Sequence, residues 1–154
     1  MITVNLTTQQ AVAHPPAGVP APAAESGLPG EETWRLPLER DPLSPSAARR
    51  EARTVLDQWG IDGETFDDAL LVVSELVTNA VLYAQLPITL CLCISTEALL
   101  IEVTDGGPAT ADASAPASRP PDEHGRGTTI IEALTTDTGA IDWNDGLIDH
   151  WATL

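Results

Sequence analysis

The sequence predicts an α/β fold, a two-layer sandwich in which helices cover one face of a mixed, mostly antiparallel sheet. Three observations support this class. The chain has 154 residues, about one domain's worth of length. Apolar residues make up 43% of it and charged residues 19%, a composition that can bury one core. Its apolar patterns follow the order strand, helix, long helix, two strands, loop, short helix and two strands.

The first elements follow a segment without periodicity. Residues 1–31 are rich in Ala, Pro and Gly, and we expect them to be a disordered tail. The folded domain is expected over residues 32–154, beginning with a strand in TWRLPLE, where apolar and other residues alternate. A helix is expected from Ser44 through AARREARTVLDQW, with Gly60 as its stop.

The segment 64–84, ETFDDALLVVSELVTNAVLYA, predicts the longest helix. It is apolar nearly all round. Its polar interruptions are Ser74, Glu75, Thr78 and Asn79, which fall at i, i+1, i+4 and i+5. This spacing predicts one polar stripe on an otherwise buried helix.

The remaining elements lie in the second half of the chain. We expect strands at 88–95 and 98–105, a long loop at 106–127, a short helix at 127–134, and a closing strand pair at 136–143 and 147–154 that turns at Asn144-Asp145-Gly146. The loop holds no large apolar side chain, which favours a mobile functional lid or disorder.

Charge and composition exclude several function classes. The formal net charge is −16, which argues against direct nucleic-acid binding and against an anionic membrane surface. All seven basic residues are Arg, so a Walker A loop and a Schiff-base lysine are excluded. Cys91 and Cys93 predict two buried thiols in a reducing compartment. With no signal peptide or apolar span, a cytoplasmic location is expected.

Glu75 and Asn79 are the first candidate site residues. They lie one helical turn apart, and their oxygen atoms suit Mg²⁺, which takes only one or two protein ligands when phosphates and waters complete its shell. The alternative is that both side chains simply face solvent along an exposed helix edge.

Two further candidates follow later in the chain. Asp105 ends an apolar strand before Gly106-Gly107, where a carboxylate could accept a hydrogen bond from a base amine and glycine would allow close approach of a flat ring. An ordinary Asp-Gly turn is the alternative. Gly125-Arg126-Gly127 precedes the short predicted helix, whose N-terminus would attract anions, although loop flexibility explains two glycines equally well.

The order of these motifs produces a family resemblance. ELVTNAV (75–81), VTDGGP (103–108) and HGRGTTIIEAL (124–134) resemble the N, G1 and G2 boxes of the GHKL, or histidine-kinase-like, ATPase superfamily. LLVVSELVTNAV and the G-R-G sequence look like the RsbW-like anti-sigma-factor serine kinases. The resemblance covers about residues 34–154 and implies the Bergerat ATP-binding fold.

The resemblance implies a role for each matching residue. Asn79 would coordinate Mg²⁺, and Glu75 would be the general base or water-orienting residue of phosphoryl transfer. Asp105 would bind adenine with Gly107 beside it. Gly125 and Gly127 would lie next to the triphosphate, and the neighbouring Arg126 and Thr128 complete the expected nucleotide-binding set.

Three functions follow. The first is an ATP- and Mg²⁺-dependent serine/threonine kinase that sequesters a sigma factor and phosphorylates an anti-anti-sigma protein, with a homodimer as the implied assembly. The second is a catalytically weak or inactive nucleotide-binding adaptor, which Ala109 in place of a G1 glycine and the nearby Glu123 favour. The third, a detached sensor-kinase, gyrase or MutL-type domain, is disfavoured because no dimerisation helix or transducer domain is expected.

Overall fold

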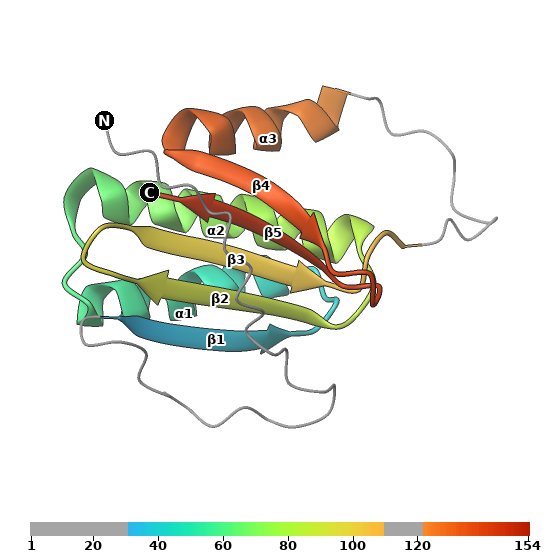
Figure 1. Cartoon of the computed structure of the whole chain (residues 1–154), viewed down its shortest axis with the longest axis horizontal. Helices are drawn as coiled ribbons and strands as arrows, with labels where there is room; N and C mark the ends of the chain where they lie inside the picture. The colour runs from blue at the N-terminus through green and yellow to red at the C-terminus, as the bar shows by residue number, and fades with distance from the viewer. Residues whose placement is uncertain (1–30, 110–121) are drawn as a thin grey trace.

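The structure is a computed structural model that describes residues 31–109 and 122–154 (Figure 1). Within these ranges the elements are β1 (Glu32–Leu38), α1 (Ser44–Gln58), α2 (Gly63–Tyr83), β2 (Ile88–Ile94), β3 (Leu99–Asp105), α3 (Asp122–Leu134), β4 (Asp137–Asp142) and β5 (Ile148–Thr153). The expected order of strands and helices is therefore present. The predicted tail and the centre of the predicted lid lie outside the described residues.

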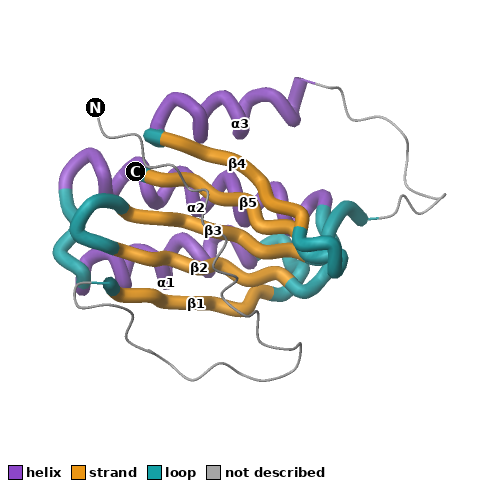
Figure 2. Tube along the Cα trace, in the orientation of Figure 1, coloured by secondary structure: helices purple, strands orange, loops and turns teal. Residues whose placement is uncertain are grey.

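The described strands form one sheet in the order β1-β2-β3-β5-β4, and each neighbouring pair is antiparallel. Helices α1 and α2 lie side by side on one face of the sheet, and α3 lies beside β4 and α2 (Figures 1 and 2). This arrangement confirms the predicted two-layer α/β sandwich. We call the face away from α1 and α2 the outer face.

The core lies between α2 and the central strands. Its largest fully buried side chains include Leu70, Val73, Val77, Leu90, Leu92, Ile101 and Val103. Each such side chain contributes about 1.5–3 kcal/mol through removal from water. In β3 the buried positions alternate with half-buried ones, and this alternation also carries Asp105, the last residue of β3, onto the helix side. The carboxylate of Asp105 therefore lies on the inner face of the sheet, at the edge of the apolar core.

Helix α3 differs from its prediction. It begins at Asp122, whereas the sequence analysis placed the start at Gly127. Gly125 and Gly127 therefore lie within the helix and do not precede it. Glycine is a weak helix former, so its presence indicated a boundary, but a close tertiary contact at Gly127, described below, accounts for its place inside the helix.

The predicted lid also differs at its beginning, because residues 106–109 pair with the end of α2. The amide of Gly106 donates to the Gln85 carbonyl, that of Gln85 donates to the Gly107 carbonyl, and that of Ala109 donates to the Tyr83 carbonyl, each at 2.8 Å. Ala84 and Pro108 form the bridge between these segments. The chain after β3 is thereby fixed to α2 by backbone atoms.

Two smaller expectations have mixed outcomes. Cys91 is buried as predicted, whereas Cys93 is only half-buried, since it lies near the end of β2 on the outer face beside Thr33. Both are free thiols. In the two described ranges, no helix has the length and apolar character needed to cross a membrane.

Candidate functional site

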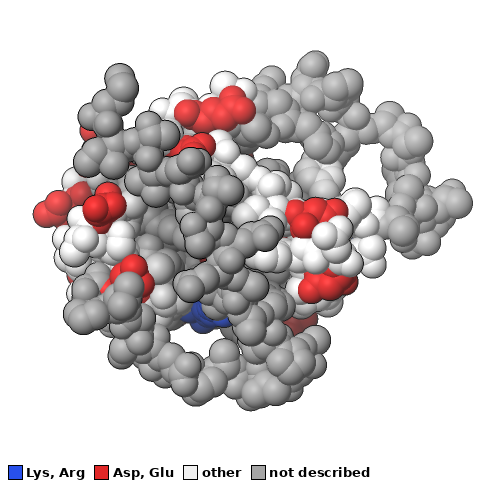
Figure 3. Space-filling model, viewed as in Figure 1, with Lys and Arg blue, Asp and Glu red and all other residues white. Residues whose placement is uncertain are grey.

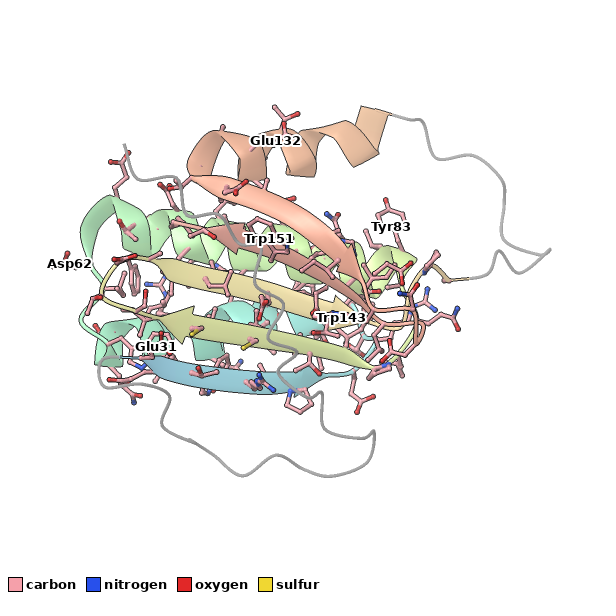
Figure 4. All side chains as sticks on the ribbon, in the orientation of Figure 1. Glu31, Asp62, Tyr83, Glu132, Trp143 and Trp151 are labelled. Carbon is pink, nitrogen blue, oxygen red and sulfur yellow. The ribbon has the colours of Figure 1, made fainter. Side chains whose placement is uncertain are left out.

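A cavity of about 420 Å³ opens where α2, β3 and β5 meet. Its wall is largely apolar, with a few polar side chains among small residues. The lining residues are Leu76, Asn79, Ala80, Tyr83, Ala84, Asp105, Gly107, Pro108, Ile148 and His150. Tyr83 of α2 and Trp143 of the β4–β5 turn lie at the same end of the molecule in Figure 4. A concave, mostly apolar site with a few polar groups is typical of a small-molecule pocket.

Asp105 is the buried charge of this cavity, with only 2% of the residue exposed. Its Oδ1 accepts a hydrogen bond from the Gly107 amide at 2.8 Å. Its Oδ2 lies 3.2 Å from Nε2 of His150. A carboxylate accepts about four hydrogen bonds, so the carboxylate retains acceptor capacity toward the cavity. Asp105 can therefore accept a hydrogen bond from a donor group of a ligand, such as an exocyclic amine.

The two positions after Asp105 require glycine for different structural reasons. A Cβ on Gly106 would collide with the Leu86 carbonyl oxygen, because the end of α2 approaches the backbone here. Gly107 has a φ of +77° and faces the carbonyl oxygen of Gly146, which would lie 3.2 Å from an added Cβ. The sequence had suggested glycines for approach to a flat ring; the structure shows Gly107 at the cavity and Gly106 against protein backbone.

Glu75 and Asn79 lie on α2 where α3 crosses it. Glu75 is half-buried and Asn79 is exposed, and Asn79 also lines the cavity. A Cβ placed on Gly127 would lie 2.6 Å from Oε2 of Glu75 and 3.9 Å from Nδ2 of Asn79. Only a residue without a side chain fits this crossing undisturbed. The structure thus brings Glu75, Asn79 and Gly127 together at one end of a site whose other end is Asp105.

These residues fit the ligands that the motifs imply. Among the described residues no cluster of three His, Cys, Asp or Glu could hold a metal alone. A Mg²⁺ ion that keeps phosphate and water ligands needs no such cluster, and Asn79 with Glu75 offers oxygen ligands beside an open cavity. The absence of a side chain on Gly127 lets the Glu75 carboxylate lie against α3 beside Asn79.

Three predicted site residues cannot be placed in the same way. Gly125, Arg126 and Thr128 belong to α3, but their surroundings lie outside what the structure describes. Their assignment to phosphate binding stays a prediction. Because helix α3 begins at Asp122, the anion-binding helix start that was predicted at Gly127 is wrong.

His150 is a site residue that the sequence pattern did not indicate. It was assigned only to a closing strand, yet β5 pairs with β3 so that His150 lies opposite Val103, on the same face as Asp105. The alternation of Ile148, His150 and Ala152 could have indicated the face. The partner strand could not be inferred, because β3 and β5 are separated by a loop, a helix and a strand.

The net charge of −16 is not gathered into one patch on the side that Figure 3 shows. Acidic side chains appear there at several separate places. An anionic ligand therefore gains no long-range attraction from the protein as a whole and must be held by local contacts. The side-chain amide of Asn79 offers one such contact.

Fold and cavity together define a small α/β domain with a ligand site between a helix and the end of a sheet. Residues 38–146, more than half of the chain, match the family described as "Histidine kinase-like ATPase domain". The chain belongs to that family, which implies ATP binding. The recognition of GHKL-type motifs in the sequence is thereby confirmed.

Among solved structures, the chain resembles "The crystal structure of the RsbU and RsbW domains of Rv1364c from Mycobacterium tuberculosis". The TM-score is 0.61 at 18% sequence identity, and the match covers 79% of this chain and 32% of that one. At this identity the likeness is one of fold, and it agrees with the RsbW-like resemblance of the sequence. A search of curated proteins gives no significant match.

Proposed function

We propose that this protein is an ATP-dependent serine/threonine protein kinase that acts as an anti-sigma factor and phosphorylates an anti-anti-sigma protein. The observation that carries the proposal is the continuity of one site. Glu75 and Asn79 lie beside Gly127, and Asn79 shares a cavity with the buried Asp105. Such a site can hold the base of a nucleotide at one end and its phosphates at the other.

Each residue has a distinct task in this proposal. ATP with Mg²⁺ supplies the transferable phosphoryl group and the neutralising charge. Asp105 accepts a hydrogen bond from the base, and the oxygen of Asn79 binds the metal. Gly125, Arg126, Gly127 and Thr128 line the phosphates.

Glu75 acts on the protein substrate rather than on the nucleotide. Its half-buried carboxylate orients the attacking serine or threonine hydroxyl and accepts its proton. Catalysis of phosphoryl transfer depends mainly on positioning the attacking hydroxyl, and it needs little covalent chemistry from the protein.

The proposed partners are a sigma factor and a small antagonist protein, with a second copy of the chain as a possible third. Support comes from the family and from a fold shared with a structure that contains an RsbW domain. A cytoplasmic location without direct nucleic-acid or membrane binding belongs to the same proposal.

A nucleotide-binding adaptor without kinase activity is the second candidate, and one backbone contact favours it. The Ala109 amide is used by the Tyr83 carbonyl and is not available to a phosphate. An adaptor would hold its partner through the same fold, whether or not the phosphoryl group is transferred.

One assay separates the two candidates. The purified chain is incubated with γ-labelled ATP, Mg²⁺ and small candidate antagonist proteins encoded nearby in the same genome. Label on a serine or threonine of the antagonist supports the kinase. Calorimetric binding of ATP without any transfer supports the adaptor, and absence of ATP binding contradicts both forms of the proposal.

A further inference from the structure

The carboxylate of Asp105 has protein contacts from two different elements. The amide of Gly107, two residues further along the chain, donates a hydrogen bond to Oδ1 at 2.8 Å. On the neighbouring strand β5, Nε2 of His150 lies 3.2 Å from Oδ2. Each oxygen thus has its own protein neighbour, and rotation of the carboxylate would disturb both contacts. The two contacts therefore favour one orientation of Asp105 toward the cavity.

His150 is placed to exert this control by the register of β3 and β5. It lies opposite Val103, so its side chain points to the face on which Asp105 lies. The two side chains differ in exposure: that of Asp105 is 3% exposed and that of His150 is 42% exposed. His150 is thus the part of the pair that a ligand in the cavity can reach, and both residues line the cavity.

We propose that His150 determines which nucleobase this site accepts. The inference rests on the proposed nucleotide binding and deepens it. Nε2 of His150, 3.2 Å from Oδ2, occupies one approach to that oxygen, so the carboxylate accepts from a single exocyclic amine of the adenine type. Without His150, Oδ2 is open on that side, and the carboxylate can meet two parallel N–H donors, such as N1–H and N2–H of guanine, with both oxygens at once. His150 therefore favours adenine, a 6-aminopurine, and disfavours guanine.

The test measures dissociation constants for ATP, GTP and inorganic tripolyphosphate by calorimetry with Mg²⁺, using the full chain. The variant His150→Ala removes the donor. His150→Gln replaces it with an amide nitrogen at a similar reach. Thr153→Ala is the matched control, because it lies on the same strand with its side chain on the outer face.

We expect the wild-type protein to prefer ATP over GTP and His150→Ala to reduce this preference about tenfold, the usual effect of losing a hydrogen bond to a charged group. The preference should return in His150→Gln and be unchanged in Thr153→Ala. Tripolyphosphate, which has no base, should bind all four proteins equally. A merely structural histidine would weaken ATP, GTP and tripolyphosphate in the same proportion.

Two results would overturn the inference, and they are distinguishable. If His150→Ala, or His150→Leu should the alanine variant not fold, keeps both the wild-type ratio and the wild-type affinities, His150 selects nothing although the nucleotide site stands. If wild-type protein binds none of the three ligands, the nucleotide-binding function itself fails, and the role of His150 fails with it.

Discussion

Asn79 is the side chain shared by the two ends of the site, since it lines the cavity and lies beside Gly127. Replacing it with Ala should weaken Mg²⁺-dependent ATP binding by at least about tenfold, because the metal loses its protein ligand. Calorimetry with Mg²⁺ and with a chelator checks this. Gln58→Ala, which removes an exposed amide at the end of α1, should have no effect.

If ATP binds wild-type protein and Asn79→Ala equally in the presence of Mg²⁺, then Asn79 does not hold the metal. The solvent-facing interpretation of this side chain would then be correct.

Glu75 should contribute to transfer and not to binding. Glu75→Gln keeps the shape of the side chain, so ATP affinity should stay near the wild-type value. Phosphorylation of the antagonist should fall by about 10²–10⁴-fold, because the amide cannot accept the hydroxyl proton. Single-turnover labelling measures this rate. Glu64→Gln, at the exposed start of the same helix, should behave like the wild type.

A wild-type transfer rate in Glu75→Gln would show that another group accepts the proton. A parallel loss of melting temperature and ATP affinity would instead assign Glu75 a structural role.

Helix α3 approaches α2 at Gly127, and this contact links two elements. Gly127→Ala places a Cβ 2.6 Å from Oε2 of Glu75, so the carboxylate must move. We expect little change in stability, because the helix propensity gained by alanine offsets the displacement of a flexible carboxylate, and a slower phosphoryl transfer, because the position of Glu75 changes. Chemical denaturation and the labelling assay measure the two effects.

Ala133→Ser is the control for Gly127→Ala, since it adds one atom at an exposed position of α3. An unchanged transfer rate in Gly127→Ala would mean that α3 does not lie against Glu75 in solution.

The outer face of the sheet carries a row of cross-strand neighbours, which are Arg35, Cys91, Glu102, Trp151 and Gly139. Burial raises the pKa of the Cys91 thiol to about 11, which makes it a poor nucleophile. Burial also raises the pKa of Glu102, the charge of Asp149 raises it further, and the Arg35 guanidinium opposes this rise. The row thus contains a carboxyl group that folding renders harder to ionise.

Glu102→Gln should stabilise the protein at neutral pH. Since the folded pKa of Glu102 lies above its ordinary value of 4.5, its contribution to stability is complete below that pH and is lost as the pH rises through the folded value. The variant should gain up to about 1 kcal/mol at neutral pH, a small figure because the half-buried carboxyl is partly screened. Urea denaturation from pH 4 upward measures the difference.

Glu97→Gln, in the exposed β2–β3 turn, is the control and should leave the pH dependence unchanged. If wild type and Glu102→Gln have the same stability at every pH, then Glu102 is solvated in the folded protein.

Ligand binding should stabilise the molecule as a whole, because the cavity joins α2 to β3 and β5. At about one hundred times its dissociation constant, ATP with Mg²⁺ adds about 2.7 kcal/mol and should raise the melting temperature by about 10 °C. Asp105→Asn should show little shift at the same ATP concentration. An equal shift with tripolyphosphate would indicate that the base is not recognised.

Local patterns in the sequence predict most of the architecture. Period-two alternation identified the strands, and the 64–84 pattern identified α2 with Glu75 and Asn79 one turn apart. Two features depended on contacts between distant segments. Gly127 indicated a helix start because its packing on Glu75 was invisible, and His150 was missed because its neighbour Asp105 is set by the β3–β5 register. Local propensity contains no information about either.

The pairing between residues 83–85 and 106–109 gives the base end of the cavity an unusual tolerance to mutation. Its three bridging hydrogen bonds join main-chain atoms, so replacing the side chains of Tyr83, Gln85 or Ala109 removes none of them. Sequences can therefore drift along both segments while Asp105 keeps its position. Gly106 and Gly107 are the exceptions, since any side chain on Gly106 meets the Leu86 carbonyl and Gly107 has a φ of +77°. A saturation scan of these segments should show two adjacent intolerant positions.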